Sequence, residues 1–334
     1  MKQVLYISSP QERCIEVWDI SKEGSLSLLQ TVKTYGEVQP LTIARKKNLL
    51  YAGIRPNCAI VTYKIKKNGL LKIVHITPIK NTPNYISIDK NNEVLLCSSY
   101  GSNTLISCEL NKFGIPKKPK NFFKNIFGCH SVVFSKNNNY VFTTSLKSDK
   151  IYFFIFKNKK IFLNPIQPIL QSKINSGPRH IICSKLNNQF FYSINELNST
   201  VDVWSISVKN HTVNLVQTVK IIDFSNNSDK AWGSEIKISP CENYLYAADR
   251  SKSIISVFFI DKKTKILKKI TQFSTEQQPR SFDIDENGKF LISAGQLSNY
   301  ISIYKISKNT GFIRLINRYK TKKGPLWTLI YKIN

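Results

Sequence analysis

A unit of short strands recurs seven times along this chain, and this repetition limits the possible fold more than any other feature. Each unit opens on a short apolar run, continues through a polar turn and enters a second apolar run. The openings lie near Pro40, Pro83, His130, Arg179, Ser234, Arg280 and Pro325, about 43 to 55 residues apart. A period in this range, with several short strands per unit, is typical of a β-propeller.

The two ends of the chain complete each other. Residues 4–32 contain three strand-like runs but lack the opening strand that the later units have, and residues 326–331 supply an opening strand without followers. Because a shared blade closes the ring and removes exposed sheet edges, we predict that the two ends build one blade together. The sequence therefore predicts a single all-β domain over residues 1–334, a seven-bladed β-propeller with four antiparallel strands per blade.

The composition limits the partners that we expect. The formal net charge is +28, but 41 of the 49 basic residues are lysines, which are spread through turns. Lys, Asn and Ile have AT-rich codons, so codon drift accounts for this charge without a nucleic-acid or membrane partner. Seven scattered cysteines without a C-x-x-C pair indicate free thiols. We see no secretory signal and no membrane-spanning run, and we expect a cytoplasmic monomer that binds a small molecule.

The stretch from Asn175 to Val203 carries the residues most suited to chemistry. Its apolar runs predict two neighbouring strands, with Arg179 and His180 at the entry of the first. Glu196 lies just beyond the end of the second strand. In an antiparallel hairpin the start of one strand and the end of the next lie at the same edge of the sheet. We therefore predict that Arg179, His180 and Glu196 meet in space.

Overlaying the units gathers polar residues at one end of the central channel. The starts of the innermost strands provide Gln39, Asn84, His130, Arg179, His180, Glu235, Arg280 and Trp327. The loops after the second strands provide Arg55, Tyr100, Lys147, Glu196, Asp249, Arg250 and Gln296. Four of the eight arginines lie at these positions, and the guanidinium fork suits phosphate or carboxylate. The pattern predicts a site for an anionic substrate, with Glu196 as a potential base.

The same residues also fit purely structural roles. His130 can satisfy backbone groups at its strand entry, and Arg179 or Arg280 can pair with a carboxylate such as Glu196. We interpret the other two histidines, His75 and His211, as surface residues. Other chemistries lack their motifs, because the sequence has no Gly-rich phosphate loop, no G-x-S-x-G and no H-E-x-x-H. The predicted mouth also has too few carboxylates for a calcium-centred lactonase.

Several short motifs relate the whole chain to a known family. They are GIRP at 53, GCHS at 128, GPRH at 177, NELNSTVDVW at 195, QPRSF at 278, AGQ at 294 and GPLW at 324. Together they resemble the bacterial 6-phosphogluconolactonases of the seven-bladed propeller type, which are related to the fungal carboxymuconate cycloisomerase. The resemblance implies hydrolysis of 6-phospho-D-glucono-1,5-lactone in the oxidative pentose phosphate pathway, and it implies no metal or organic cofactor.

The resemblance also implies roles for individual residues. In the cycloisomerase branch, His, Arg and Glu correspond to His130, Arg179 and Glu196, and a further Arg matches Arg280. We hypothesise that Glu196 or His130 takes a proton from the water that attacks the lactone carbonyl, while Arg179 stabilises the oxyanion. Three further groups are expected to bind the substrate. His180 is expected to lie beside the oxyanion, and Arg280 and Arg55 are expected to bind the 6-phosphate.

Two other functions stay open from the sequence. A non-catalytic interaction propeller predicts a mouth dominated by aromatic and apolar residues. An enzyme of the cycloisomerase branch predicts a substrate that carries a carboxylate in place of the phosphate. A polar insertion over residues 223–230 is expected to cover the opening of the next unit.

Overall fold

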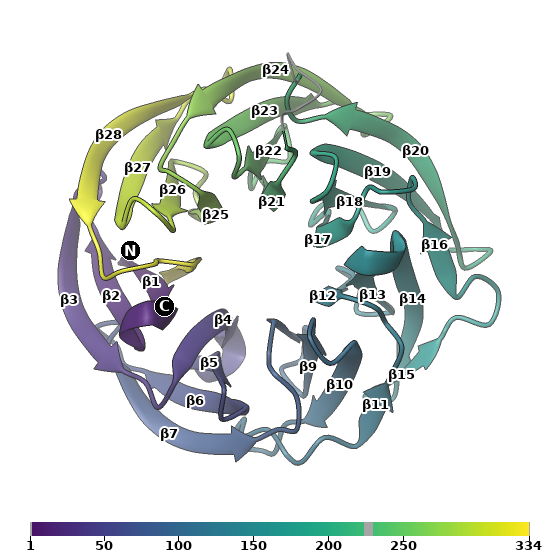
Figure 1. Cartoon of the computed structure of the whole chain (residues 1–334), viewed down its shortest axis with the longest axis horizontal. Helices are drawn as coiled ribbons and strands as arrows, with labels where there is room; N and C mark the ends of the chain where they lie inside the picture. The colour runs from purple at the N-terminus through teal and green to yellow at the C-terminus, as the bar shows by residue number, and fades with distance from the viewer. Residues whose placement is uncertain (1, 224–229, 334) are drawn as a thin grey trace.

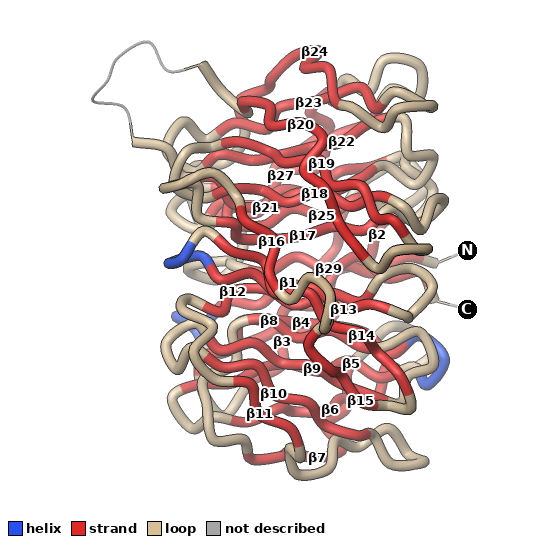
Figure 2. The backbone as a smooth tube through the Cα atoms, turned by 90° about the vertical axis from the view of Figure 1, so that its right-hand side faces the viewer, coloured by secondary structure: helices blue, strands red, loops and turns tan. Residues whose placement is uncertain are grey.

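The strands of this chain form seven sheets around a central channel, as Figure 1 shows. The structure is a computed structural model that describes residues 2–223 and 230–333. Seen edge-on in Figure 2, the strands cross the thickness of the ring and the loops gather at its two faces. The predicted seven-bladed propeller is confirmed. Most of the insertion predicted to cover an opening, residues 224–229, lies outside the described residues.

Each blade is a meander whose strands run outward from the channel. The inner strands are β4 (Glu37–Ala44), β8 (Tyr85–Ile88), β12 (Cys129–Phe134), β17 (Pro178–Cys183), β21 (Gly233–Ile238), β25 (Pro279–Ile284) and β29 (Trp327–Lys332). The second strands are β5 (Leu49–Arg55), β9 (Val94–Ser99), β13 (Tyr140–Ser145), β18 (Phe190–Asn195), β22 (Tyr244–Asp249), β26 (Phe290–Gly295) and β1 (Gln3–Ser9).

The outer half of each blade completes the sheets. The third strands are β6 (Ala59–Ile65), β10 (Thr104–Glu109), β14 (Lys150–Lys157), β19 (Thr200–Ser207), β23 (Ile254–Ile260), β27 (Tyr300–Ile306) and β2 (Cys14–Ile20). The outermost strands are β7 (Leu71–Pro78), β11 (Asn121–Phe123), β15 (Lys160–Leu163), β20 (Thr212–Lys220), β24 (Leu267–Ser274), β28 (Ile313–Lys320) and β3 (Leu26–Lys33). The described residues also contain three short 3-10 turns, which are η1 (Pro10–Glu12), η2 (Arg45–Lys47) and η3 (Leu146–Ser148).

The ring closes through the pairing of the last strand with the first. Strand β29 runs antiparallel to β1, in a register that extends from Gln3 opposite Lys332 to Ser8 opposite Trp327. The two ends of the chain accordingly lie side by side in Figure 1. This pairing covers the edge of β1 and makes β29 the inner strand of its blade, as in the other six sheets. The predicted shared blade is confirmed. No helix in the described ranges is long and apolar enough to cross a membrane.

One blade departs from the simple four-strand pattern. Its third strand, β14, pairs with β15 along one part of its length and with a short fifth strand, β16 (Ile169–Gln171), along another. Pro165 and Pro168 lie between β15 and β16. Because proline has no backbone N–H to donate to a ladder, a continuous outer strand is interrupted at this point. The outermost position of this blade is therefore shared by two short strands.

The apolar core is divided among the seven junctions between neighbouring blades. Each of seven buried clusters combines strands from two adjacent sheets. In one of them the rings of Phe142 and Phe191 stack across the junction with their centroids 4.4 Å apart. Fully burying one such side chain contributes about 1.5–3 kcal/mol, so every junction is held mainly by the hydrophobic effect. A blade is stable only when both of its faces are covered, so neighbouring blades stabilise each other.

A short polar side chain fixes the turn between the inner and second strands. In one turn Asp285 accepts hydrogen bonds from the backbone N–H groups of Asn287, Lys289 and Phe290, at 3.3, 2.6 and 2.7 Å. Asp89 does the same in another blade. A serine takes this place elsewhere, as Ser239 does for the N–H of Tyr244 at 3.1 Å. The turns are thus closed by side chains that compete well for backbone donors.

We predict that Asp285→Ala lowers the free energy of unfolding by about 2 kcal/mol, because it leaves buried N–H donors without an acceptor. Asp285→Ser should lose less, since serine satisfies the equivalent N–H in other blades. Denaturant unfolding of the two variants and the wild type measures the difference. Equal losses in both variants would show that the side-chain acceptor is not what stabilises the turn.

Candidate active site

Five of the seven inner strands carry a β-bulge near their starts. The pairing register shifts just after Val38, Cys129, Pro178, Gly233 and Pro279. A bulge inserts an extra residue, bends the strand and re-aims a side chain. The side chains that the bulges bring to the start of the channel belong to Gln39, His130, Arg179, Glu235 and Arg280. Five of the residues predicted for the mouth therefore lie at bulges.

Hydroxyl groups of the preceding blade hold four of these bulges in place. In each bond a side-chain hydroxyl donates to a backbone carbonyl oxygen. The four bonds run from Ser8 to Gln39 at 2.8 Å, from Ser98 to His130 at 2.9 Å, from Thr144 to Arg179 at 2.9 Å and from Ser234 to Pro279 at 2.7 Å. Each bond ties the backbone of a bulged strand to its neighbour around the ring. The bulged backbone is therefore fixed by the propeller itself and does not depend on a ligand.

A carboxylate shared by two arginines forms the centre of the site. Nε of Arg179 lies 2.9 Å from Oε2 of Glu196, and Nη2 of Arg250 donates to the same oxygen at 2.7 Å. The predicted meeting of Arg179 and Glu196 is confirmed. In the described part of the chain, Oε1 of Glu196 has no protein hydrogen-bond partner. The arginines thus fix the carboxylate and leave one oxygen available.

His180 lies on the channel side of Arg179 and contacts it directly. Its Nε2 is 3.1 Å from Nη1 of Arg179, and its Nδ1 is 3.0 Å from Oε1 of Glu235. Burial and the positive charge of Arg179 lower the pKa of His180 well below its ordinary value, so the ring is neutral. Tyr85 and Trp327 pack against the ring, with centroid distances of 5.2 and 6.1 Å. Both ring nitrogens therefore have protein partners.

His130 has a different environment from His180, although the two rings are only 5.1 Å apart. Burial, followed by the charge of Arg179, lowers the pKa of His130 well below its ordinary value. Nδ1 of His130 is buried and has no hydrogen-bond partner among the described residues. Its ring also meets the ring of Tyr100 edge-on at 5.9 Å. His130 is thus a neutral imidazole with unused hydrogen-bonding capacity.

Two further arginines complete the mouth. Arg55 pairs with Glu37 at 2.9 Å and also donates to the side-chain oxygen of Gln39. Arg280 lies near enough to Arg179 and Arg55 for their charges to lower its pKa, although burial is the larger cause. Within residues 2–223 and 230–333, no hydrogen bond or ion pair joins the guanidinium of Arg280 to a protein group. Arg280 is therefore a cation that is available to a ligand.

The charges at this mouth do not balance. Four arginines face three carboxylates, those of Glu37, Glu196 and Glu235. Burial lowers the pKa of Arg250, and repulsion from Arg179 adds to the effect. Crowded, partly desolvated cations raise the free energy of the empty site, and an anion that binds among them relieves the repulsion. This arrangement of charges suits an anionic ligand.

Other residues predicted for the mouth have different roles. Asp249 accepts hydrogen bonds from Ser251 and from the backbone N–H of Trp232, at 2.6 and 2.9 Å, so it organises a loop. Nζ of Lys147 lies 5.1 Å from the ring centroid of Tyr100, as a cation over an aromatic face. His75 and His211 are exposed, as predicted.

The sequence analysis placed Glu235 at the mouth but missed the neighbouring charged pair of Lys237 and Asp283. Glu235 and Lys237 lie two apart on β21 and share one face of the strand. Nζ of Lys237 is 3.4 Å from Oδ1 of Asp283 on the neighbouring strand β25. Glu235 and Lys237 also line a cavity of about 270 Å³, together with Tyr85 and apolar side chains of β12 and β17. Glu235 and Lys237 alternate with an apolar residue on an inner strand, and this pattern could have indicated charged side chains inside the channel.

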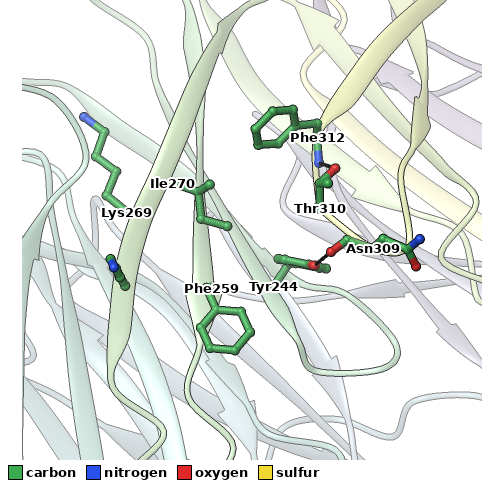
Figure 3. Close-up of a pocket in the computed structure, with 8 residues that line it drawn as sticks. Tyr244, Phe259, Lys269, Ile270, Asn309, Thr310 and Phe312 are labelled. Carbon is green, nitrogen blue, oxygen red and sulfur yellow. Dashed lines mark hydrogen bonds between the residues drawn. The ribbon is translucent and has the colours of Figure 1, made fainter.

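A larger hollow of about 560 Å³ lies on the outside of the ring, between β24 and the loop of residues 309–312 that leads into β28. Figure 3 shows its aromatic lining, in which the hydroxyl of Tyr244 is already bonded to the carbonyl of Asn309. It lacks the converging buried charges of the channel mouth, so we do not assign the chemistry to it. In the described ranges, no group of three His, Cys, Asp or Glu side chains is placed to hold a metal.

Comparisons with known proteins agree with this architecture. The family model described as "Lactonase, 7-bladed beta-propeller" matches residues 4–330. A protein of Buchnera aphidicola subsp. Schizaphis graminum named 6-phosphogluconolactonase is 42% identical over 335 residues, which cover 100% of both chains. Its namesake from Erwinia tasmaniensis is 36% identical, also over 100% of both chains. The solved periplasmic gluconolactonase of Pseudomonas aeruginosa has a TM-score of 0.90 over 100% of both chains at 18% identity, a likeness of fold.

Two buried neutral histidines make stability depend on pH. The folded pKa values of His130 and His180 lie below the unfolded value of about 6.5, so below that pH the unfolded chain binds more protons. The free energy of unfolding should therefore fall on acidification below about pH 6.5, by up to about 1.4 kcal/mol per pH unit for each histidine. Denaturant unfolding from about pH 7 to 5 measures this slope.

Comparing histidine variants tests whether His130 contributes to the pH dependence of the free energy of unfolding. His130→Gln should lose one histidine's share of the pH dependence, because glutamine does not titrate. His75→Gln is the matched control, since it replaces an exposed histidine of an outer strand. The same slope in His130→Gln and in the wild type would contradict the burial of a neutral His130.

Proposed function

The chain belongs to the lactonase family of seven-bladed β-propellers, and on this premise we propose that it hydrolyses 6-phospho-D-glucono-1,5-lactone to 6-phospho-D-gluconate in the oxidative pentose phosphate pathway. One observation carries the proposal. Arg280 has no protein partner in the described chain and lies beside the Arg179–Glu196 pair. Such a site offers separate groups for the phosphate and for the lactone carbonyl. We place the reaction in the cytosol, in keeping with seven free cysteines.

Glu196 is the better placed of the two candidate bases. Its Oε2 is held by Arg179 and Arg250, which fixes the direction of Oε1. Oε1 takes a proton from water as the water oxygen forms a bond to the carbonyl carbon. When the tetrahedral intermediate collapses, the bond from that carbon to the ring oxygen breaks. The ring oxygen leaves as a hydroxyl with the proton that Glu196 returns, and the product is the open carboxylic acid, which ionises.

Arg179 is placed to stabilise the oxyanion that forms in this step. Its Nε forms an ion pair with Glu196, and its Nη1 contacts Nε2 of His180 and donates to the carbonyl of Ser234. In the described chain Nη2 has no protein partner and is the donor available to the substrate oxygen. A fixed, charged donor in a desolvated site stabilises developing charge strongly, because it needs no reorganisation. His180 supports this role by holding Nη1, and His130 lines the same space.

Arg280 and Arg55 provide the phosphate subsite. Arg280 has its full set of donors free, and Arg55 is tied on one side to Glu37. Guanidinium groups bind phosphate oxygens in pairs, and the uncompensated positive charge favours a dianion. Arg250 is less available, because it donates to Glu196 and stacks over Trp232 with Cζ 4.0 Å from the ring centroid.

We predict that the purified protein releases 6-phosphogluconate from fresh 6-phosphogluconolactone well above the spontaneous rate. Glu196→Gln should lower kcat by about 10²–10⁴-fold, because it removes the proton acceptor. His130→Gln should lower kcat by less than about tenfold. The reverse order of these losses would assign the base to His130. A folded wild type that adds nothing to the spontaneous rate would instead favour a non-catalytic propeller.

We predict a substrate-dependent effect for Arg280→Gln. Loss of charge-assisted hydrogen bonds worth about 1.5–3 kcal/mol should lower kcat/KM for the phosphorylated lactone by about 10–100-fold. The unphosphorylated gluconolactone should be hydrolysed with unchanged kcat/KM. The matched control is Arg314→Gln, at an exposed position on β28. Equal losses on both lactones would remove Arg280 from the phosphate subsite. Competition by a carboxylated lactone tests the remaining alternative substrate.

A further inference from the structure

We infer that Glu235 is a positioning residue that sets the orientation of the Arg179 guanidinium. Glu235 acts through His180, because it determines which ring nitrogen of His180 carries the proton. The inference rests on the proposed lactonase function, in which Arg179 meets the oxyanion. Glu235 lies on β21, 55 residues beyond His180, and the two meet across the junction between neighbouring blades. Its side chain does not reach Arg179 by a direct hydrogen bond in the described structure. It acts through the ring of His180.

The hydrogen-bonding partners of His180 determine its tautomer. Arg179 can only donate, so Nε2 of His180 must accept from Nη1 of Arg179 at 3.1 Å. A neutral imidazole has one proton, which must then be on Nδ1. Nδ1 donates that proton to Oε1 of Glu235 at 3.0 Å. Without an acceptor at Glu235, the proton can move to Nε2, where it would face the donors of Arg179.

The same bulge of β21 holds Arg179 in two ways. The carbonyl of Ser234 accepts from Nη1 of Arg179, and the next residue, Glu235, holds His180 against the same Nη1. With Glu196 on Nε, these contacts leave Nη2 as the donor for the substrate. Loss of the His180 contact frees the guanidinium to turn about its remaining bonds. A small turn is costly, because oxyanion stabilisation depends on donor direction.

Glu235 is itself held firmly in place. Its Oε1 also accepts from the backbone N–H of Ile236 at 3.1 Å, and its Oε2 from the hydroxyl of Ser281 at 3.4 Å. Burial raises the pKa of Glu235, and the nearby charge of Lys237 opposes this effect. The rings of Tyr85 and Trp327 confine His180 from the other sides. The carboxylate and the imidazole thus form a rigid pair behind Arg179.

Kinetics of two Glu235 variants test the inference. Glu235→Leu should lower kcat by about tenfold or more with KM nearly unchanged, because the oxyanion exists only near the transition state. Glu235→Gln retains an oxygen acceptor for Nδ1 and should recover most of this loss. Glu242→Leu is the matched control, because Glu242 is also buried and bonds the neighbouring blade through Ser184. It should lower stability while kcat per folded molecule stays unchanged.

A spectroscopic measurement separates positioning from simple stability. The chain has four histidines, so the ¹⁵N resonances of His180 can be assigned by their absence in His180→Asn. The wild type should show the Nδ1–H tautomer, Glu235→Gln the same, and Glu235→Leu a shift toward Nε2–H. A wild-type His180 protonated on Nε2, or an unchanged kcat in folded Glu235→Leu, would overturn the inference. Failure of the lactonase proposal would appear differently, as a folded wild type without activity but with the Nδ1–H tautomer.

Discussion

The positions of the mouth residues depend on hydrogen bonds between neighbouring blades. In these bonds the hydroxyl groups of Ser8, Ser98, Thr144 and Ser234 donate to backbone carbonyl oxygens at the β-bulges. A bulge by itself is a local irregularity, with an unpaired residue and a bent strand. Here the neighbouring blade binds the irregular backbone and the next junction supports that blade, so the position of each mouth residue is set by the whole ring. The backbone of Arg179 and of His130 is therefore held by hydrogen bonds from the preceding blade. Preorganisation of this kind is what electrostatic catalysis requires.

The crowding of arginines is the main conflict between stability and function in the structure. Bringing Arg179, Arg250 and Arg280 together while removing them from water costs free energy, which Glu196 offsets only in part. The seven apolar junctions provide the stability that tolerates this arrangement. Because the arginines repel one another, an anion that binds among them lowers the free energy of the site. Additional carboxylates at the mouth would stabilise the protein without a ligand, but they would weaken its attraction for an anion.

The sequence predicted the parts of the structure that depend on local pattern. The blade period, the shared blade and the meeting of Arg179 with Glu196 follow from strand alternation and hairpin geometry. The link between His180 and Glu235 could not be predicted, because it joins neighbouring blades and depends on a bulge that re-aims one residue. The role of Asp249 in a loop was missed for a similar reason, since its partners come from an adjoining turn. The roles proposed for the site residues are not fixed by their positions alone.

The closing of the ring has a consequence for protein synthesis. Strand β29 is made after all other strands, yet it is the innermost strand of its blade and carries Trp327, which packs against His180. During translation the earlier blades can fold as they emerge, but β1 has no inner partner and the last junction stays open. The proposed anion site therefore gains the wall that Trp327 provides only after β29 has paired with β1.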